Sequence, residues 1–175
     1  MYLRGPTNSR RDSLRQIAAA NHGYFTAAQA VRCGYGNGNH SYHLIRGNWR
    51  KIEVGLYRLP EYPDSPEADL TKWCLWSRNQ QNQPQGVISH KTALAIHGLG
   101  EYDAQAIHMT VPLRFQKKSP PQVILYRRTL SLSAIEPRAG FFVTNLAQTL
   151  DDLRPELEAT GVWEELSRKA AEKIG

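Results

Sequence analysis

The residues with the clearest chemistry lie between Asn39 and Pro60, in the run NHSYHLIRGNWRKIEVGLYRLP. Amide and imidazole side chains, which open this run, are groups that hydrogen-bond to the edges of DNA bases. The basic side chains that follow are suited to backbone phosphates, whose contacts set register without reading sequence. This order predicts a DNA contact. The candidate DNA-binding residues are Thr26, Asn37, Asn39, His40, Tyr42, His43, Arg46, Arg50, Lys51 and Arg58.

A different chemistry is offered by Ser89, His90, His97 and His108. His90 and His97 are two helical turns apart, so both can lie on one face and bind a metal or act in catalysis with His108. No acidic residue accompanies them at ligand spacing, and Ser89 fits better as a helix N-cap. Buried histidines that hydrogen-bond to the backbone explain the pattern equally well.

Asp151 and Asp152 resemble a pair of catalytic carboxylates. Adjacent residues diverge by about 100° on a helix, so the two cannot share one substrate, and we expect them at a solvated helix end. The chain also lacks a glycine-rich phosphate loop and a nucleophile elbow. We therefore expect no catalytic residue, no metal ligand, no cofactor and no enzyme activity.

The positive charge of the chain is confined to its first third. Of 175 residues, the first 59 contain nine Lys/Arg and two Asp/Glu, a net charge of +7, whereas residues 60–175 carry a net charge of −1. A local excess of this kind suits a polyanion, because each neutralised phosphate releases condensed counterions. The alternative is a solvated basic surface that only maintains solubility.

Composition indicates a soluble protein. No apolar run approaches the roughly 18 residues that a membrane span requires, and no apolar region follows the N-terminal arginines as it would in a secretory signal. Cys33 and Cys74 lie far apart without a metal-type C-x-x-C pair, which favours reduced thiols. We expect a cytoplasmic location and no membrane partner.

Periodicity and turn residues predict three short helices in the first third, over about residues 11–20, 27–33 and 39–46. Two short strands follow, NWRKIEV and LYRL, with Gly55 at the turn. Three helices and then a hairpin is the order of a winged helix-turn-helix. In this arrangement Leu44 and Ile45 would face the core, and Arg58 would stay in water.

The stretch PEYPDSP contains three prolines and predicts a stiff linker over residues 60–66. Beyond it, helical and extended segments alternate over 67–175 and predict a small α+β domain with a mostly antiparallel sheet. The predicted fold is therefore α+β overall, with an N-terminal winged helix-turn-helix over 1–59, the linker, and the second domain.

Five blocks resemble, in order and spacing, the AbiEi-type antitoxins of bacterial abortive-infection (type IV) toxin-antitoxin systems and their transcription-regulator relatives. The blocks are HGYFTAAQA, YHLIRGNWRKIEVGLYRLP, SHKTALAIHGL, IHMTVP and VTNLAQTLDDL, within Leu14 to Leu153. The residues that carry the resemblance are Tyr42, His43, Gly47, Asn48, Trp49, Gly55, Tyr57, Ser89, His90, Ala93, Leu94, His97 and Gly98.

This resemblance implies an N-terminal domain that binds inverted repeats in its own promoter and represses transcription. It implies a C-terminal domain that supports repression and counteracts a nucleotidyltransferase toxin without forming a stable complex. The expected partner is double-stranded promoter DNA, bound by a monomer or by a dimer that forms on DNA. The alternatives are an interaction module that acts through its C-terminal domain, and a degenerate nuclease-like protein.

Overall fold

The computed structural model describes residues 7–175, which form a mixed α+β fold in two compact units. The first unit ends at Pro84 and the second spans Gln85–Gly175. Arg4, which was counted in the basic excess, lies outside the described residues. Two units were expected, but the division falls well beyond the predicted linker at 60–66.

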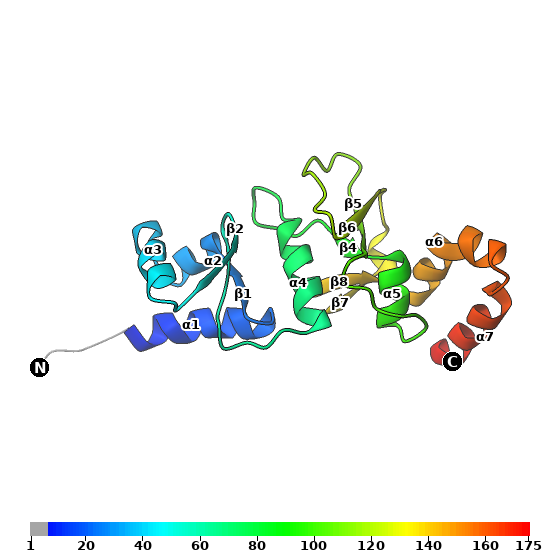
Figure 1. The fold of residues 1–175 in the computed structure, drawn as a ribbon, viewed down its shortest axis with the longest axis horizontal. Helices are drawn as coiled ribbons and strands as arrows, with labels where there is room; N and C mark the ends of the chain where they lie inside the picture. The colour runs from blue at the N-terminus through cyan, green and yellow to red at the C-terminus, as the bar shows by residue number, and fades with distance from the viewer. Residues whose placement is uncertain (1–6) are drawn as a thin grey trace, which may run out of the picture. The chain divides into compact units, whose positions relative to one another are not determined.

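The first unit contains four helices and a small antiparallel sheet with the strand order β1-β3-β2 among its described residues. Figure 1 shows α1, α2 and α3 beside this sheet. Its elements are α1 (Thr7–Ala20), β1 (Tyr24–Thr26), α2 (Ala27–Arg32), α3 (Asn37–Ile45), β2 (Arg50–Glu53), β3 (Leu56–Arg58) and α4 (Pro66–Trp76).

Local sequence explains the two boundaries that position α3. Helix α2 begins with a capping box in which Thr26 and Gln29 each accept a hydrogen bond from the other's backbone N–H. Helix α3 ends before Gly47, whose φ of +72° lies in the left-handed region that glycine adopts without strain. The chain can therefore turn sharply from α3 into β2.

An aromatic core holds α1, the sheet and α3 together. Phe25 and Trp49 meet edge to face with ring centroids 4.9 Å apart, and Tyr57 lies 5.5 Å from Trp49. Leu14 and Ala18 of α1 complete the cluster. Burying each large side chain contributes about 1.5–3 kcal/mol, so this cluster is a main source of stability for the unit.

Helix α4 belongs to the first unit, whereas the sequence placed it in the second domain. Ala68 and Leu75 of α4 pack with Tyr24 and Leu56 of the sheet. Arg78, just after the helix, lies 3.0 Å from the carboxylate of Glu53 on β2. The proline-rich stretch thus returns the chain onto its own sheet instead of separating two domains.

The second unit contains a five-stranded sheet with the order β6-β5-β4-β8-β7. The pairs β5·β6 and β4·β8 are parallel and the other two pairs are antiparallel, so the sheet is mixed instead of mostly antiparallel. The long loop between β5 and β6 brings the chain back to the same end of the sheet, which a parallel pair requires. The elements are β4 (Val87–Ile88), α5 (His90–Ile96), β5 (Ile107–Val111), β6 (Val123–Arg127), η1 (Leu132–Ala134), β7 (Ile135–Arg138), β8 (Phe141–Thr144), α6 (Leu146–Ala159) and α7 (Trp163–Ile174).

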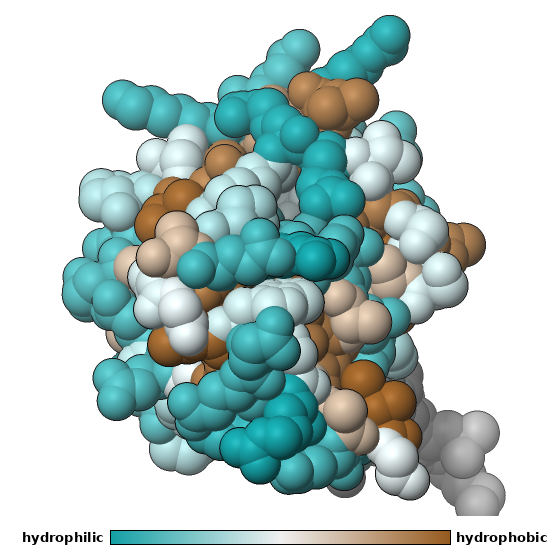
Figure 2. Space-filling model, turned by 90° about the vertical axis from the view of Figure 1, so that its right-hand side faces the viewer, coloured by the Kyte–Doolittle hydropathy of each residue, from teal (hydrophilic) through white to brown (hydrophobic). Residues whose placement is uncertain are grey.

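Leucines of α5 and α6 form the second unit's helical core, which α7 covers through Trp163, Leu166 and Ala170. Figure 2 shows one face of the molecule, on which hydrophilic residues predominate and apolar residues are scattered. Exposed ion pairs lie along α6 and α7, such as Arg154 with Glu158 and Lys169 with Glu165. Among the described helices, none has both the length and the apolarity of a membrane span.

Candidate nucleic-acid interface

Helix α3 exposes most of the polar residues that the sequence singled out. Asn37, Asn39 and Arg46 are exposed, and the ring of Tyr42 is 54% exposed. The guanidinium of Arg46 lies 5.5 Å from the centre of the Tyr42 ring. The outer face of α3 therefore presents amide, phenol and guanidinium groups, which can all hydrogen-bond to DNA.

The opposite side of α3 is fixed in the core. The Nε2 atom of His40 lies 3.0 Å from the carbonyl oxygen of Tyr35, and Leu44 packs against the aromatic cluster. Ile45, which was expected in the core, is 85% exposed. Of the two adjacent apolar residues, only Leu44 lies on the same face as His40, one helical turn away.

The start of β2 adds cations to the same region. Arg50 and Lys51 are exposed and directly follow the turn that ends α3. Within residues 7–175, neither they nor Arg46 forms an ion pair with an acidic side chain. Unpaired cations beside an exposed polar helix are what binding to a polyanion requires.

Three of the candidate contact residues are removed from this surface by their internal contacts. Thr26 is 1% exposed and caps α2, while Asn82 donates a hydrogen bond to its hydroxyl group at 2.9 Å. His40 is 6% exposed and bonded to Tyr35. The side chains of Thr26 and His40 are buried and form hydrogen bonds within the protein, so neither can reach a nucleic acid.

Arg58 is the third of these residues. The sequence predicted that it stays in water, but it is only 4% exposed. Its guanidinium donates to the carboxylate of Asp64 at 2.5 Å and to the carbonyl oxygens of Pro63 and His22. It also lies 4.7 Å from the centre of the Tyr24 ring. Arg58 therefore ties β3 to the proline-rich stretch.

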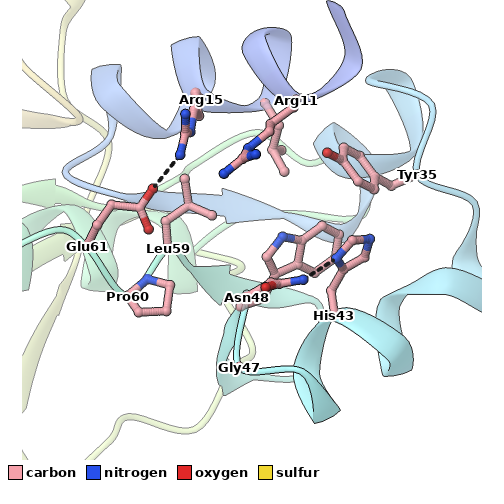
Figure 3. A pocket seen from close by; sticks show the side chains of 11 residues that line it. Arg11, Arg15, Tyr35, His43, Gly47, Asn48, Leu59, Pro60 and Glu61 are labelled. Atoms are coloured by element: carbon pink, nitrogen blue, oxygen red, sulfur yellow. Dashed lines mark hydrogen bonds and ion pairs between the residues drawn. The ribbon is translucent and has the colours of Figure 1, made fainter. Parts of the chain in front are cut away.

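The structure adds two cations that the sequence did not place at the contact. Arg11 and Arg15 of α1 line a cavity of about 690 Å³ whose other wall is the turn from Gly47 to Trp49. Figure 3 shows Arg11 extending from α1 into the space between that helix and the turn, while Arg15 points toward Glu61. The sequence did not reveal this proximity, because more than 30 residues separate Arg11 and Arg15 from the turn.

His43 connects α3 to this turn. Asn48 lies with its Nδ2 atom 3.2 Å from His43 Nδ1, and the imidazole stacks on the indole of Trp49. Burial, together with the charges of Arg10 and His40, lowers the pKa of His43 from its ordinary value. The lowered pKa favours the neutral imidazole, to whose Nδ1 atom the Asn48 amide can donate.

The second unit gathers a separate polar cluster around the start of α5. The ring of His90 stacks on Tyr126 with centroids 3.5 Å apart, and the Tyr126 hydroxyl lies 2.9 Å from His108 Nδ1. Ser89 precedes α5 as expected, but its hydroxyl makes no capping bond and lies 2.9 Å from His90 Nδ1. His97 is not part of the cluster, since its Nε2 atom is 2.8 Å from the carbonyl oxygen of Thr144.

Asp152 differs from the solvated residue that the sequence predicted. Its side chain is fully buried, and its Oδ1 atom accepts hydrogen bonds from Arg128 and Gln148. Its Oδ2 atom is buried without a hydrogen-bond partner, whereas Asp151 is exposed. Within residues 7–175, no three His, Cys, Asp or Glu side chains are close enough to hold a metal ion.

Neither a scan against protein-family models nor a search of curated proteins found a match to this chain.

Proposed function

We propose that the protein is a transcriptional regulator that binds double-stranded DNA through its first unit. In this proposal residues 7–59 act as a winged helix-turn-helix, with α3 in the major groove and β2 and β3 as the wing. The observation that carries the proposal is the exposed polar face of α3 beside the unpaired cations Arg46, Arg50 and Lys51. A helix of this kind fits a groove about 12 Å wide.

Contacts divide by chemistry into two kinds. Asn39 and Tyr42 lie on the exposed face of α3 and are the proposed base readers, together with Asn37 at its start. Arg50 and Lys51 lie at the start of β2, just after α3, and are the proposed phosphate contacts. Sequence discrimination then depends on α3, whereas affinity for any duplex depends on the cations.

The target follows from the resemblance to AbiEi-type antitoxins. We propose that the DNA is the promoter of the protein's own gene, with inverted repeats that two protomers occupy. A two-fold operator matches two copies of one recognition helix, spaced by a multiple of the helical turn. The toxin-directed role implied for the second unit is part of the same proposal.

Fluorescence anisotropy with the upstream duplex tests this function. The Arg50→Ala/Lys51→Ala double variant should bind every duplex more weakly. The dependence of its affinity on salt concentration should correspond to the release of about two fewer counterions. Arg168→Ala is the matched control, because Arg168 is an exposed arginine of the second unit. Equal affinity and an unchanged salt slope in the double variant would refute the phosphate contacts.

A further inference from the structure

The cavity between α1 and the turn from Gly47 to Trp49 has features beyond those of a DNA contact. We propose that it binds a small organic anion, a carboxylate or phosphate attached to an apolar body. We further infer that the bound anion alters DNA affinity through the turn. This second step depends on the proposed function, whereas the binding site itself does not.

The size of the cavity suits a small molecule. Its volume is about 690 Å³, within the range of roughly 300–1,000 Å³ that is typical of ligand pockets. Its walls come from α1, the turn after α3, and the segment from Leu59 to Glu61. All of these belong to the first unit.

The base of the cavity is apolar. Leu14, Trp49 and Leu59 contribute side chains that are 2%, 4% and 6% exposed. An apolar ligand body placed against them would leave water without breaking any hydrogen bond of the protein. The phosphates of a DNA duplex lie on a convex surface. They could contact the protruding arginines but could not fill the apolar floor of the cavity.

Positive charge dominates the rim. Arg11 forms no ion pair among the described residues, and its guanidinium extends into the space shown in Figure 3. Arg15 and Glu61 are 3.7 Å apart with side chains about half exposed. An ion pair of this kind contributes little, so an incoming anion can replace Glu61 as the partner of Arg15.

Two polar side chains at the end of α3 and in the following turn join the wall of the cavity. The Nδ1 atom of His43 lies 3.2 Å from the side-chain amide nitrogen of Asn48. His43 lines the cavity together with Asn48. A few polar groups that converge above an apolar base are characteristic of small-molecule sites.

The cavity wall is also the connection between α3 and β2. The backbone N–H groups of Asn48 and Trp49 both donate to the carbonyl oxygen of His43, at 2.9 and 3.3 Å. A ligand that contacts His43 and Asn48 therefore bears on the end of the proposed recognition helix. If the turn has two conformations and the ligand binds one of them more tightly, ligand binding changes the affinity for DNA.

Two-dimensional NMR of the ¹⁵N-labelled 175-residue chain tests the site without DNA. The probes are benzoate, phenylpropionate and adenosine monophosphate, compared with inorganic phosphate and with neutral benzyl alcohol. We expect saturable shifts of the Trp49 indole N–H and of residues 47–49 with the ring-bearing anions. Comparison of benzoate and phenylpropionate with adenosine monophosphate shows whether the site prefers a carboxylate or a phosphate.

Arg11→Gln should weaken binding of the best probe by about tenfold or more, the loss of one charge-assisted hydrogen bond. Arg32→Gln is the matched control, since Arg32 is exposed on α2 and does not line the cavity. The site is refuted if no ring-bearing anion shifts residues 47–49 at millimolar concentration, or if Arg11→Gln binds as tightly as the parent. Inorganic phosphate or benzyl alcohol binding equally well would refute the combined apolar and anionic recognition.

The coupling has its own test. The best probe, added to a complex with the upstream duplex at constant ionic strength, should change DNA affinity in the parent and not in Arg11→Gln. If the probe binds but does not change the affinity for DNA, the coupling is refuted while the proposed anion site still stands. A chain that binds the probe but no DNA would refute the proposed function alone.

Discussion

The imidazole of His43 lies flat against the indole of Trp49, with ring centroids 4.6 Å apart and ring planes inclined by 18°. His43 belongs to the last turn of α3, and Trp49 immediately precedes β2. Because Trp49 also contacts Phe25 and Tyr57, this stack joins the end of α3 to the core of the first unit. This stack therefore helps to fix the proposed recognition helix on the core, together with the contacts of His40 and Leu44.

Replacing that indole should destabilise the first unit. We expect Trp49→Ala to lower the free energy of unfolding by about 3–5 kcal/mol, because it leaves a cavity among the aromatic rings. Trp73→Ala on α4 is the matched control and should cost less, since Trp73 is partly exposed. Urea unfolding followed by circular dichroism measures both, and equal losses would contradict the role of Trp49.

Arg58→Met separates stability from DNA binding. The substitution removes donors from the carbonyl oxygens of His22 and Pro63, so we expect a loss of about 1–3 kcal/mol in the free energy of unfolding. DNA affinity per folded molecule should stay unchanged, because Arg58 is buried. Denaturation and anisotropy, measured on one preparation, test this. A drop in DNA affinity like that expected of the Arg50→Ala/Lys51→Ala variant would show that Arg58 contacts DNA.

Acidification should destabilise the second unit. Burial is the main cause that lowers the pKa of both His90 and His108, although Asp152 raises that of His90 and Glu156 raises that of both. As the pH falls, these histidines are protonated in the unfolded chain before they are protonated in the folded one. The free energy of unfolding is therefore highest above about pH 6.5, and it decreases as the pH falls toward and through the folded pKa values. Urea midpoints between about pH 7.5 and pH 5 measure this loss.

A variant identifies the group responsible for this pH dependence. His90→Asn removes one of the two histidines and tolerates the φ of +50° at this position. We expect a shallower fall of stability with acidification in this variant. A slope identical to that of the parent would show that protonation of His90 does not contribute.

Adjacent aspartates provide a direct comparison. Asp152→Ala should cost about 1–2 kcal/mol, because it leaves Gln148 and the half-exposed Arg128 without their shared acceptor. Asp151→Ala should change stability by less than about 0.5 kcal/mol, as is usual for an exposed site. Thermal unfolding of both variants measures the difference, and a reversed order would contradict the burial of Asp152.

Local signals in the sequence predicted the elements of the first unit well. Gly55 adopts positive φ at the hairpin turn where the sequence placed it, and α2, which Thr26 caps, lies close to its predicted range. Caps and turns of this kind depend only on neighbouring residues, so a single sequence contains the necessary information. The exposed polar face of α3 followed from the same reasoning.

Errors arose wherever a distant partner decides the outcome. Arg58 is buried because Asp64 and two carbonyl oxygens receive its charge, and Asp152 is buried because Arg128 arrives from beyond β6. Strand β7 was missed, since its residues Ile135–Arg138 include a proline and two charged side chains on a sheet edge. Periodicity cannot reveal which segments meet, so the cavity beside Arg11 was equally hidden.

The central claim is that α3 and the start of β2 contact DNA, and amide chemical shifts test it most directly. Titration of the ¹⁵N-labelled chain with its upstream duplex should shift or broaden residues 37–46 together with Arg50 and Lys51. An unrelated duplex should affect Arg50 and Lys51 but leave Asn39 much less perturbed. Shifts confined to the second unit, or none at low salt with either duplex, would contradict the claim.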